Sequence, residues 1–111
     1  MFDKESGLLQ GTVELLVLKT LSWGPMHGYG IASWIESVTD DALSVEEGSL
    51  YPALYRLERK GWIEAEWGLS ERKRRVKFYR LTDTGRERLK VVTEQWTRFA
   101  NAVHRILLDP T

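Results

Sequence analysis

The sequence SVEEGSLYPALYRLERKGWIEAEWGLSERKRRVKFYRLTDTG, residues 44–85, decides the fold of this chain. It begins with apolar residues at helical spacing, with Leu50, Leu54 and Leu57 on one face, and it reaches a helix-stopping glycine at Gly61. Two short runs rich in apolar and aromatic residues follow, separated by a strongly basic turn. This order predicts a helix followed by a basic β-hairpin, a shape that enters the grooves of DNA.

The start of this helix can be assigned in two ways. Ser44 with Glu47 three residues later fits a capping box. Ser49 as N-cap would instead place Pro52 in the first turn, where the missing N–H of proline is tolerated. We favour a helix from about residue 46 to residue 60, with a slight irregularity at Pro52 and a stop at Gly61.

The hairpin is predicted from the pattern of its two runs. Residues 62–67 alternate partly between apolar and acidic side chains, residues 68–73 form the turn, and residues 76–81 return. Tyr79 is expected to pack in the core of the hairpin. Thr82 can cap the next helix, and Asp83 in its first turn complements the helix dipole.

Two helices are expected before the opening segment. Residues 8–22 are densely apolar, with a stripe broad enough to be buried on more than one side, and the breakers Gly24 and Pro25 follow. Residues 27–38 carry apolar side chains at helical spacing, although two glycines weaken the first turn.

The last segment, from residue 83 to about residue 108, is expected to form one helix of roughly 39 Å. Its apolar residues recur at spacings of three and four, which is a heptad seam: Leu89, Val92, Trp96, Phe99, Val103 and Ile106. A helix of this length cannot pack its whole seam onto a small three-helix domain, so we expect a homodimer. The predicted interface adds three residues of the first helix: Leu9, Val13 and Leu16. Packing of the seam within one chain is the alternative.

These elements predict a mainly α fold with a small β-hairpin, namely a winged helix-turn-helix plus a long C-terminal helix. Residues 1–82 would form the DNA-binding domain and residues 83–111 the dimerisation helix. The chain has no cysteine, and its polar, acidic N-terminus is unlike a secretory signal. No apolar run approaches the roughly 20 residues that span a bilayer, so we expect a cytoplasmic protein without a membrane partner.

The formal net charge is zero, but the charges are unevenly placed. Residues 1–47 hold eight acidic and two basic side chains, whereas residues 48–111 hold eight acidic and fourteen basic ones. DNA responds to the local patch rather than to the total charge. The neutral total therefore does not exclude a nucleic-acid partner.

Side chains able to bind DNA gather on the third helix and on the hairpin. The outward face of the helix offers Ser49, Tyr51, Tyr55, Arg56, Arg59 and Lys60, and the hairpin offers Arg72, Lys73, Arg74, Arg75 and Lys77. Arginine and lysine neutralise phosphates and release counterions, while serine, tyrosine and arginine on a helix can reach base edges. The alternatives are a solvated hairpin tip, half-buried tyrosines, and arginines paired with nearby acids.

Three stretches resemble one known family, the PadR family of bacterial transcriptional regulators. They are LLQGTVELLVLKTLSWGPMHGYGIASWI (residues 8–35), EEGSLYPALYRLERKGWI (46–63) and RRVKFYRLTDTGRERL (74–89). The single helix after the hairpin resembles the short subfamily, in which one C-terminal helix completes the dimer. The resemblance implies a dimeric repressor and, for some members, a response to phenolic acids or planar aromatic drugs. It places Ser49, Tyr51, Pro52 and Tyr55 on the DNA-facing start of the third helix, and residues 72–75 at the wing.

Two-fold symmetry would then match a pseudo-palindromic operator in double-stranded DNA. Trp96 and Phe99 are possible contacts for a small aromatic effector, although plain interface packing is the alternative for Trp96. His27 and His104 lack metal-ligand spacing, and no nucleophile, acid/base pair or phosphate loop is recognisable, so neither a metal, a cofactor nor an enzymatic activity is expected. The competing function is a winged-helix protein-interaction module that does not bind DNA.

Overall fold

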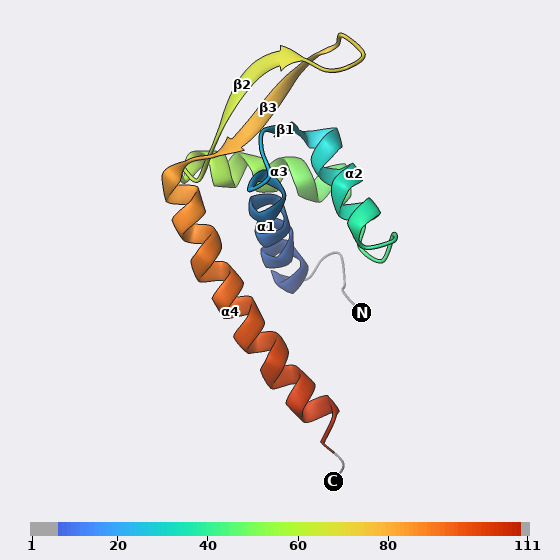
Figure 1. Ribbon diagram of the computed structural model, residues 1–111, viewed down its shortest axis with the longest axis vertical. Helices are drawn as coiled ribbons and strands as arrows, with labels where there is room; N and C mark the ends of the chain where they lie inside the picture. Colours follow the sequence, from blue (N-terminus) through green and yellow to red (C-terminus); the bar gives the residue numbers. More distant parts are fainter. Residues whose placement is uncertain (1–6, 110–111) are drawn as a thin grey trace.

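The part of the chain that the structure describes forms four helices and a small antiparallel sheet, which confirms the predicted fold class (Figure 1). The computed structural model describes the backbone of residues 7–109 and the side chains of residues 11–109. The elements in chain order are α1 (Gly7–Leu21), β1 (Met26–His27), α2 (Gly28–Val38), α3 (Glu47–Arg59), β2 (Ile63–Leu69), β3 (Arg75–Leu81) and α4 (Asp83–Leu107). Within this described part, no helix is both long and apolar enough to cross a membrane.

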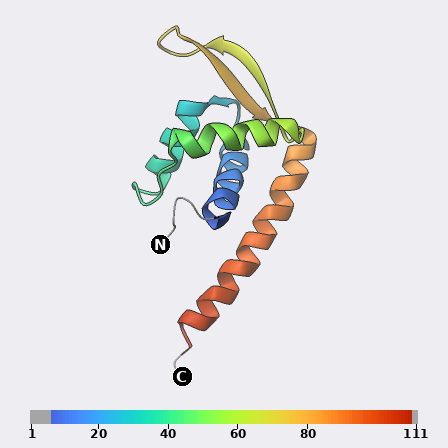
Figure 2. The same ribbon diagram turned by 180° about the vertical axis from the view of Figure 1, so that it is seen from behind.

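The molecule is elongated because a β-hairpin and the last helix project from a central helical body (Figure 1). Its principal extents are 57 × 28 × 23 Å. The hairpin of β2 and β3 leaves the body on one side, and α4 runs away from it on the other, as both views show (Figure 2). The body itself consists of α1, α2 and α3, so the wing and the long helix are arms on opposite sides of one core.

The core lies where the three helices meet the base of the sheet. Leu50, Leu54 and Leu57 of α3 are fully buried, as the sequence pattern predicts. The other buried apolar side chains come from α1, α2, the loop before α3, α3 itself and the two hairpin strands: Val13, Val17, Leu18, Leu21, Ile31, Ile35, Val45, Ala53, Ile63, Tyr79 and Leu81. Burial of the side chain of Tyr79 confirms its predicted place in the hairpin core.

The first turn of α3 forms without either predicted side-chain cap. Its N-cap is Glu46, whose side chain makes no capping hydrogen bond. The backbone N–H groups of Ser49 and Leu50 both donate to the carbonyl of Glu46, at 2.9 and 2.8 Å. Neither the Ser44 capping box nor the Ser49 cap is therefore used, and Pro52 lies inside the helix.

The sheet has a third strand that the sequence pattern did not predict. Its order is β1-β3-β2, and the two residues of β1 pair with Tyr79 and Phe78 of β3. The predicted turn at residues 68–73 is also wrong in its bounds, because β2 continues to Leu69, which pairs with Arg75. The true turn is closed by the Ser70 N–H, which donates to the carbonyl of Arg74 at 2.9 Å.

The start of α4 is bonded to the chain that leaves α3. Gly61 ends α3 in the left-handed conformation, with a φ of 76°, as predicted. The Thr82 hydroxyl donates to the carbonyl of Gly61 at 2.6 Å and accepts from the Gly85 N–H at 3.0 Å, which confirms the predicted cap. The Thr82 N–H donates to the carbonyl of Trp62 at 3.1 Å. These bonds fix the long helix to the end of the third helix.

Candidate nucleic-acid interface

The outward face of α3 presents two tyrosines one helical turn apart. Tyr51 and Tyr55 are 46% and 61% exposed, opposite the buried leucine stripe of the same helix. Ser49 is half-buried and Pro52 exposed. The ring of Tyr51 lies over the start of α2, because a Cβ placed on Gly28 would be only 2.7 Å from the Tyr51 hydroxyl oxygen. The Tyr51 end of this face therefore packs against α2, and Tyr55 remains exposed to a ligand.

Arg56 does not belong to this open face. Its guanidinium is half-buried, and its Nε donates to Oε1 of Glu14 on α1 at 3.2 Å. The charge of Arg56 is thus used to join α3 to α1, as in the ion-pair alternative noted from the sequence, although with an acid 42 residues away. Arg59, by contrast, is exposed, and its guanidinium lies 5.8 Å from the ring centre of Tyr55.

Lys60 lies at the end of α3, away from the two tyrosines. Its ammonium is exposed and stacks on the ring of Trp62 at 4.7 Å from the ring centre. The guanidinium of Arg88 on α4 lies 4.8 Å from the same ring centre. Trp62 therefore contacts two cations at the junction between α3 and α4, one from the C-cap of α3 and one from α4.

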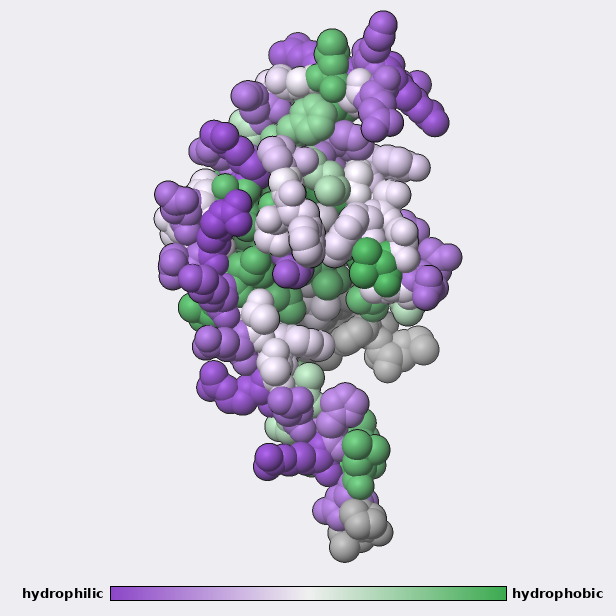
Figure 3. All heavy atoms as spheres, viewed as in Figure 1, coloured by the Kyte–Doolittle hydropathy of each residue, from purple (hydrophilic) through white to green (hydrophobic). Residues whose placement is uncertain are grey.

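The wing tip carries a continuous run of exposed cations. Arg72, Lys73, Arg74 and Arg75 are all exposed, and Lys77 is half-buried beside the ring of Trp67. Two further bonds close the turn: the Arg74 N–H donates to the Ser70 hydroxyl at 3.2 Å, and the Lys73 N–H donates to the Ser70 carbonyl at 2.8 Å. Figure 3 shows hydrophilic side chains crowded around this end of the molecule.

The base of the wing packs against the same core as α3. Tyr79 of β3 has a raised pKa, first because burial disfavours its phenolate and then because Glu58 and Tyr51 lie nearby. Glu58 and Tyr51 are both on α3. Tyr79 is also buried in the same core cluster as Leu50, Leu54 and Leu57 of α3, so the face of β3 that carries Tyr79 packs toward α3.

The heptad seam of α4 divides into a packed half and an open half. Leu89 and Val92 are partly buried against the core, and Trp96 is half-buried. Phe99 is 50% exposed and Ile106 77% exposed, with Val103 between them also exposed. Figure 3 shows apolar side chains along one side of this open end. The open half is therefore an exposed apolar stripe on the part of α4 that projects beyond the helical body (Figure 1).

The predicted interface residues of α1 lie differently. Val13 is only 2% exposed and belongs to the core of its own chain, so it offers no surface to a second copy. Val13 is therefore removed from the predicted interface, because the core of the same chain buries most of the broad apolar stripe of α1. Leu16 is partly buried against the core, and the side chain of Leu9 lies outside the described residues.

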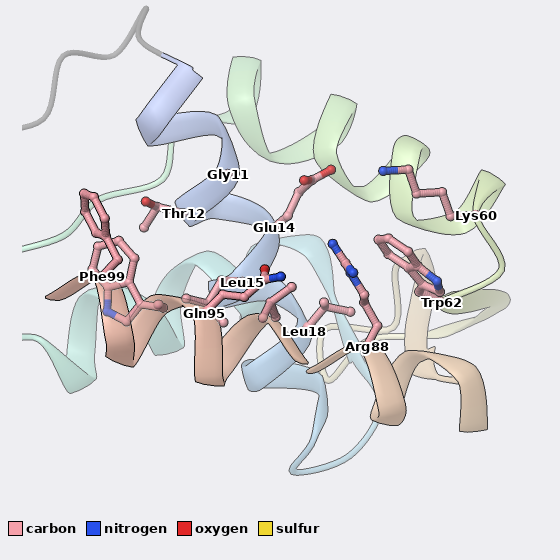
Figure 4. Close-up of a pocket in the computed structure, with 12 residues that line it drawn as sticks. Gly11, Thr12, Glu14, Leu15, Leu18, Lys60, Trp62, Arg88, Gln95 and Phe99 are labelled. Atoms are coloured by element: carbon pink, nitrogen blue, oxygen red, sulfur yellow. The ribbon is translucent and has the colours of Figure 1, made fainter. Parts of the chain in front are cut away.

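A groove of 370 Å³ separates α1 from the first half of α4 (Figure 4). Apolar and aromatic side chains make much of its lining, including Leu15, Leu18, Trp62, Trp96 and Phe99. The rings of Trp96 and Phe99 lie 5.9 Å apart and tilted by 42° at one end. Arg88 reaches into the same groove, and among the described residues its buried Nε has no hydrogen-bond partner.

Three residues of these sites were not singled out from the sequence. Trp62 and Arg88 meet only because the chain closes at the α3–α4 junction, which no local pattern shows. Trp67 stacks with the two strand cations Arg75 and Lys77, and partial alternation in residues 62–67 was the signal that could have placed it on one face. Among the described residues, the two tyrosines of α3 and the cations of the wing tip are exposed, whereas Arg56 is paired with Glu14 of α1.

The sequence and the fold match proteins of one family. The family model described as "Transcriptional regulator PadR-like family" matches residues 17–91. A transcriptional regulator from Clostridium thermocellum has a similar structure, with a TM-score of 0.81, 32% identity, and coverage of 90% of this chain and 97% of that one. A PadR-like regulator from Bacillus cereus has a TM-score of 0.77 and 28% identity, with coverage of 93% and 98%.

A curated relative carries a more specific name. The negative transcriptional regulator PadR of Bacillus subtilis is 30% identical over 73 residues, which are 66% of this chain and 40% of that protein. The family model alone covers more than half of the chain, and the solved structures agree with it in sequence and in fold. The chain belongs to the PadR-like family of transcriptional regulators.

Proposed function

We propose that this chain is a sequence-specific repressor that binds double-stranded DNA as a homodimer. In this proposal residues 1–82 read the DNA and residues 83–111 dimerise. The observation that carries it is the exposure of two tyrosines on the outward face of α3 together with a run of exposed cations on the wing that follows this helix. An open helix face fits a major groove, and a basic hairpin beside it fits the flanking backbone or minor groove. The similarity to a negative regulator supports repression.

Dimerisation would follow from the open half of the α4 seam. Phe99, Val103 and Ile106 expose apolar surface along a helix that projects from the body. A second copy of the same helix can cover this stripe by two-fold pairing, in which the same apolar stripe is used by both copies. A two-fold dimer would place two copies of α3 on successive major grooves, about 34–36 Å apart, and so favour a pseudo-palindromic operator.

A small aromatic effector would act through the groove between α1 and α4. Trp96 and Phe99 offer tilted rings for stacking, and the buried Nε of Arg88 offers a donor to a polar group on the ligand. The groove also contains Trp62 and Lys60, which belong to the junction with α3. A ligand that prefers one angle between α4 and α3 would shift the population of DNA-competent dimers.

A gel-shift experiment with fragments of the source genome tests the proposal. The protein is incubated with fragmented genomic DNA and excess mixed-sequence competitor, and the retained fragments are sequenced. We expect a small set of fragments that share an inverted repeat. Retention of no fragment above competitor would contradict DNA reading and would favour the protein-interaction module.

A further inference from the structure

The wing has two faces of opposite electrostatic character, and the strand register defines them. Residues paired across the two strands share a face, and the faces alternate along each strand. One face carries Ile63, Ala65, Trp67 and Leu69 with Arg75, Lys77, Tyr79 and Leu81. The other carries Glu64, Glu66 and Gly68 with Val76, Phe78 and Arg80.

The face with Tyr79 is basic at its distal end and has no acid among its eight paired residues. It is continuous with the core on the side of α3, since Ile63, Tyr79 and Leu81 are buried in the same cluster as the leucines of that helix. The opposite face carries two glutamates, and Glu64 is ion-paired with Arg80 across the strands. A phosphate would be attracted by the first face and repelled by the carboxylates of the second.

Trp67 is the feature that organises the basic face. Its side chain is 55% exposed at a position where the core has already ended. The guanidinium of Arg75 lies 4.6 Å from its ring centre, and the ammonium of Lys77 lies 5.8 Å from it. Lys77 is the residue directly opposite Trp67, and Arg75 is its diagonal neighbour. One exposed ring thus holds two long cations that would otherwise sample many rotamers.

A cation stacked on an aromatic ring keeps its N–H groups free for another partner. The ring contacts the flat face of the guanidinium, while the N–H donors at the edge of the guanidinium still point outward. Ordering a long side chain before binding reduces the entropy that is lost when it contacts a phosphate.

We propose that the wing meets DNA with its α3-side face and that Trp67 is a positioning residue that holds Arg75 and Lys77 ready for phosphate contact. The inference rests on the proposed DNA-binding function and adds the face and the residue that the function requires. It also separates the basic residues of the wing, because Arg80 lies on the opposite face and takes no part.

Two arginines of β3 provide a matched test of the face. Arg75→Ala and Arg80→Ala each remove one positive charge from the same strand, but from opposite faces. Binding is measured by fluorescence anisotropy with a 30-base-pair duplex of mixed sequence, over a series of salt concentrations. Arg75→Ala is expected to weaken binding about tenfold and to flatten the salt slope by about 0.9, the value for one phosphate contact. Arg80→Ala is expected to change the affinity less than twofold. Equal effects of the two variants would overturn the assignment of the face.

A double-mutant cycle tests the positioning role. Trp67→Ala removes no charge, so it should weaken binding about three- to tenfold, the size of one or two cation–π contacts, at an unchanged salt slope. In the Arg75→Ala background the same change should cost about twofold or less, because only Lys77 remains to be held. Trp67→Phe, which keeps an aromatic face, should restore most of the affinity. Additive effects in the cycle, or no effect of Trp67→Ala, would overturn the proposal.

A folding control accompanies the binding measurements. Thermal unfolding of each variant is expected to match that of the unaltered protein, because the substituted side chains are exposed. If the unaltered protein binds the duplex with a steep salt dependence while Trp67→Ala and Arg75→Ala bind equally well, the inference fails and DNA binding stands. If the unaltered protein binds no duplex at all, the proposed function fails and the inference fails with it.

Discussion

Gly85 approaches the backbone of Trp62 so closely that a Cβ on residue 85 would overlap the Trp62 carbonyl oxygen and lie 2.9 Å from the carbonyl carbon. The same carbonyl accepts the N–H of Thr82, so it cannot swing away without losing that bond. The absence of a side chain at Gly85 thus allows the first turn of α4 to pack against the chain that leaves α3. The orientation of the long helix relative to the third helix depends on this one missing side chain.

The first prediction concerns this contact. Gly85→Ala is expected to lower the free energy of unfolding by about 2–3 kcal/mol, because the overlap is with backbone rather than with a movable side chain. Gly48→Ala is the matched control, since a Cβ there meets nothing within 4 Å and should stabilise the helix by about 0.5–1 kcal/mol. Urea unfolding measures both, and equal stabilities of the two variants would contradict the account of the junction.

The second prediction concerns the wing tip. Replacing both Arg74 and Arg75 with alanine should weaken binding to any duplex roughly 10- to 100-fold, because each exposed guanidinium is available for a charge-assisted hydrogen bond with a phosphate. The slope of log affinity against log salt should flatten by about 1.8. Anisotropy titrations at four salt concentrations measure the slope. A slope that stays at the unaltered value would exclude the wing from the phosphate contacts.

The third prediction concerns the dimer. Introducing Asp at both Phe99 and Ile106 should convert the protein to a monomer, because paired stripes cannot bury four uncompensated carboxylates. Asn101→Asp is the control, since it adds one carboxylate at an exposed position on the other side of α4. Sedimentation velocity at micromolar concentration distinguishes the states. A doubly substituted protein with the mass of the unaltered protein would refute the seam as the interface.

The fourth prediction concerns the groove. Trp96→Ala should abolish binding of planar aromatic ligands, because it removes the larger of the two tilted rings. Isothermal titration with a panel of aromatic carboxylates and planar aromatic cations measures the loss, with Trp23→Ala as a control on an exposed ring in the loop that follows α1. Unchanged titration curves in Trp96→Ala would remove this residue from the effector site.

Much of the fold was predictable because its signals are local. The leucine spacing of α3, the stop at Gly61 and the cap at Thr82 each lie within one turn of the element that they define. Strand β1 was not predictable, since two residues cannot show alternation and their partners lie about 50 residues later in the chain. The pairing of Arg56 with Glu14 was also not predictable, because it depends on how α3 packs on α1.

The faces of the wing depended on a register that the sequence did not determine. A turn at residues 68–73 would have paired Trp67 with Arg74 and placed Val76 and Phe78 on its face. The observed turn pairs Trp67 with Lys77 and brings Arg75 to the same side. An odd shift in pairing exchanges the two faces of a strand, so the basic run was recognisable from the sequence while the face that carries it was not.

The central claim is that two copies of this chain read one DNA site together. Hydroxyl-radical footprinting on a genomic fragment that the protein selects tests it most directly. We expect two protected segments related by inverted symmetry, with centres about 10 base pairs or a multiple of that apart. A single protected segment without an inverted counterpart, or cleavage unchanged at saturating protein, would contradict the account.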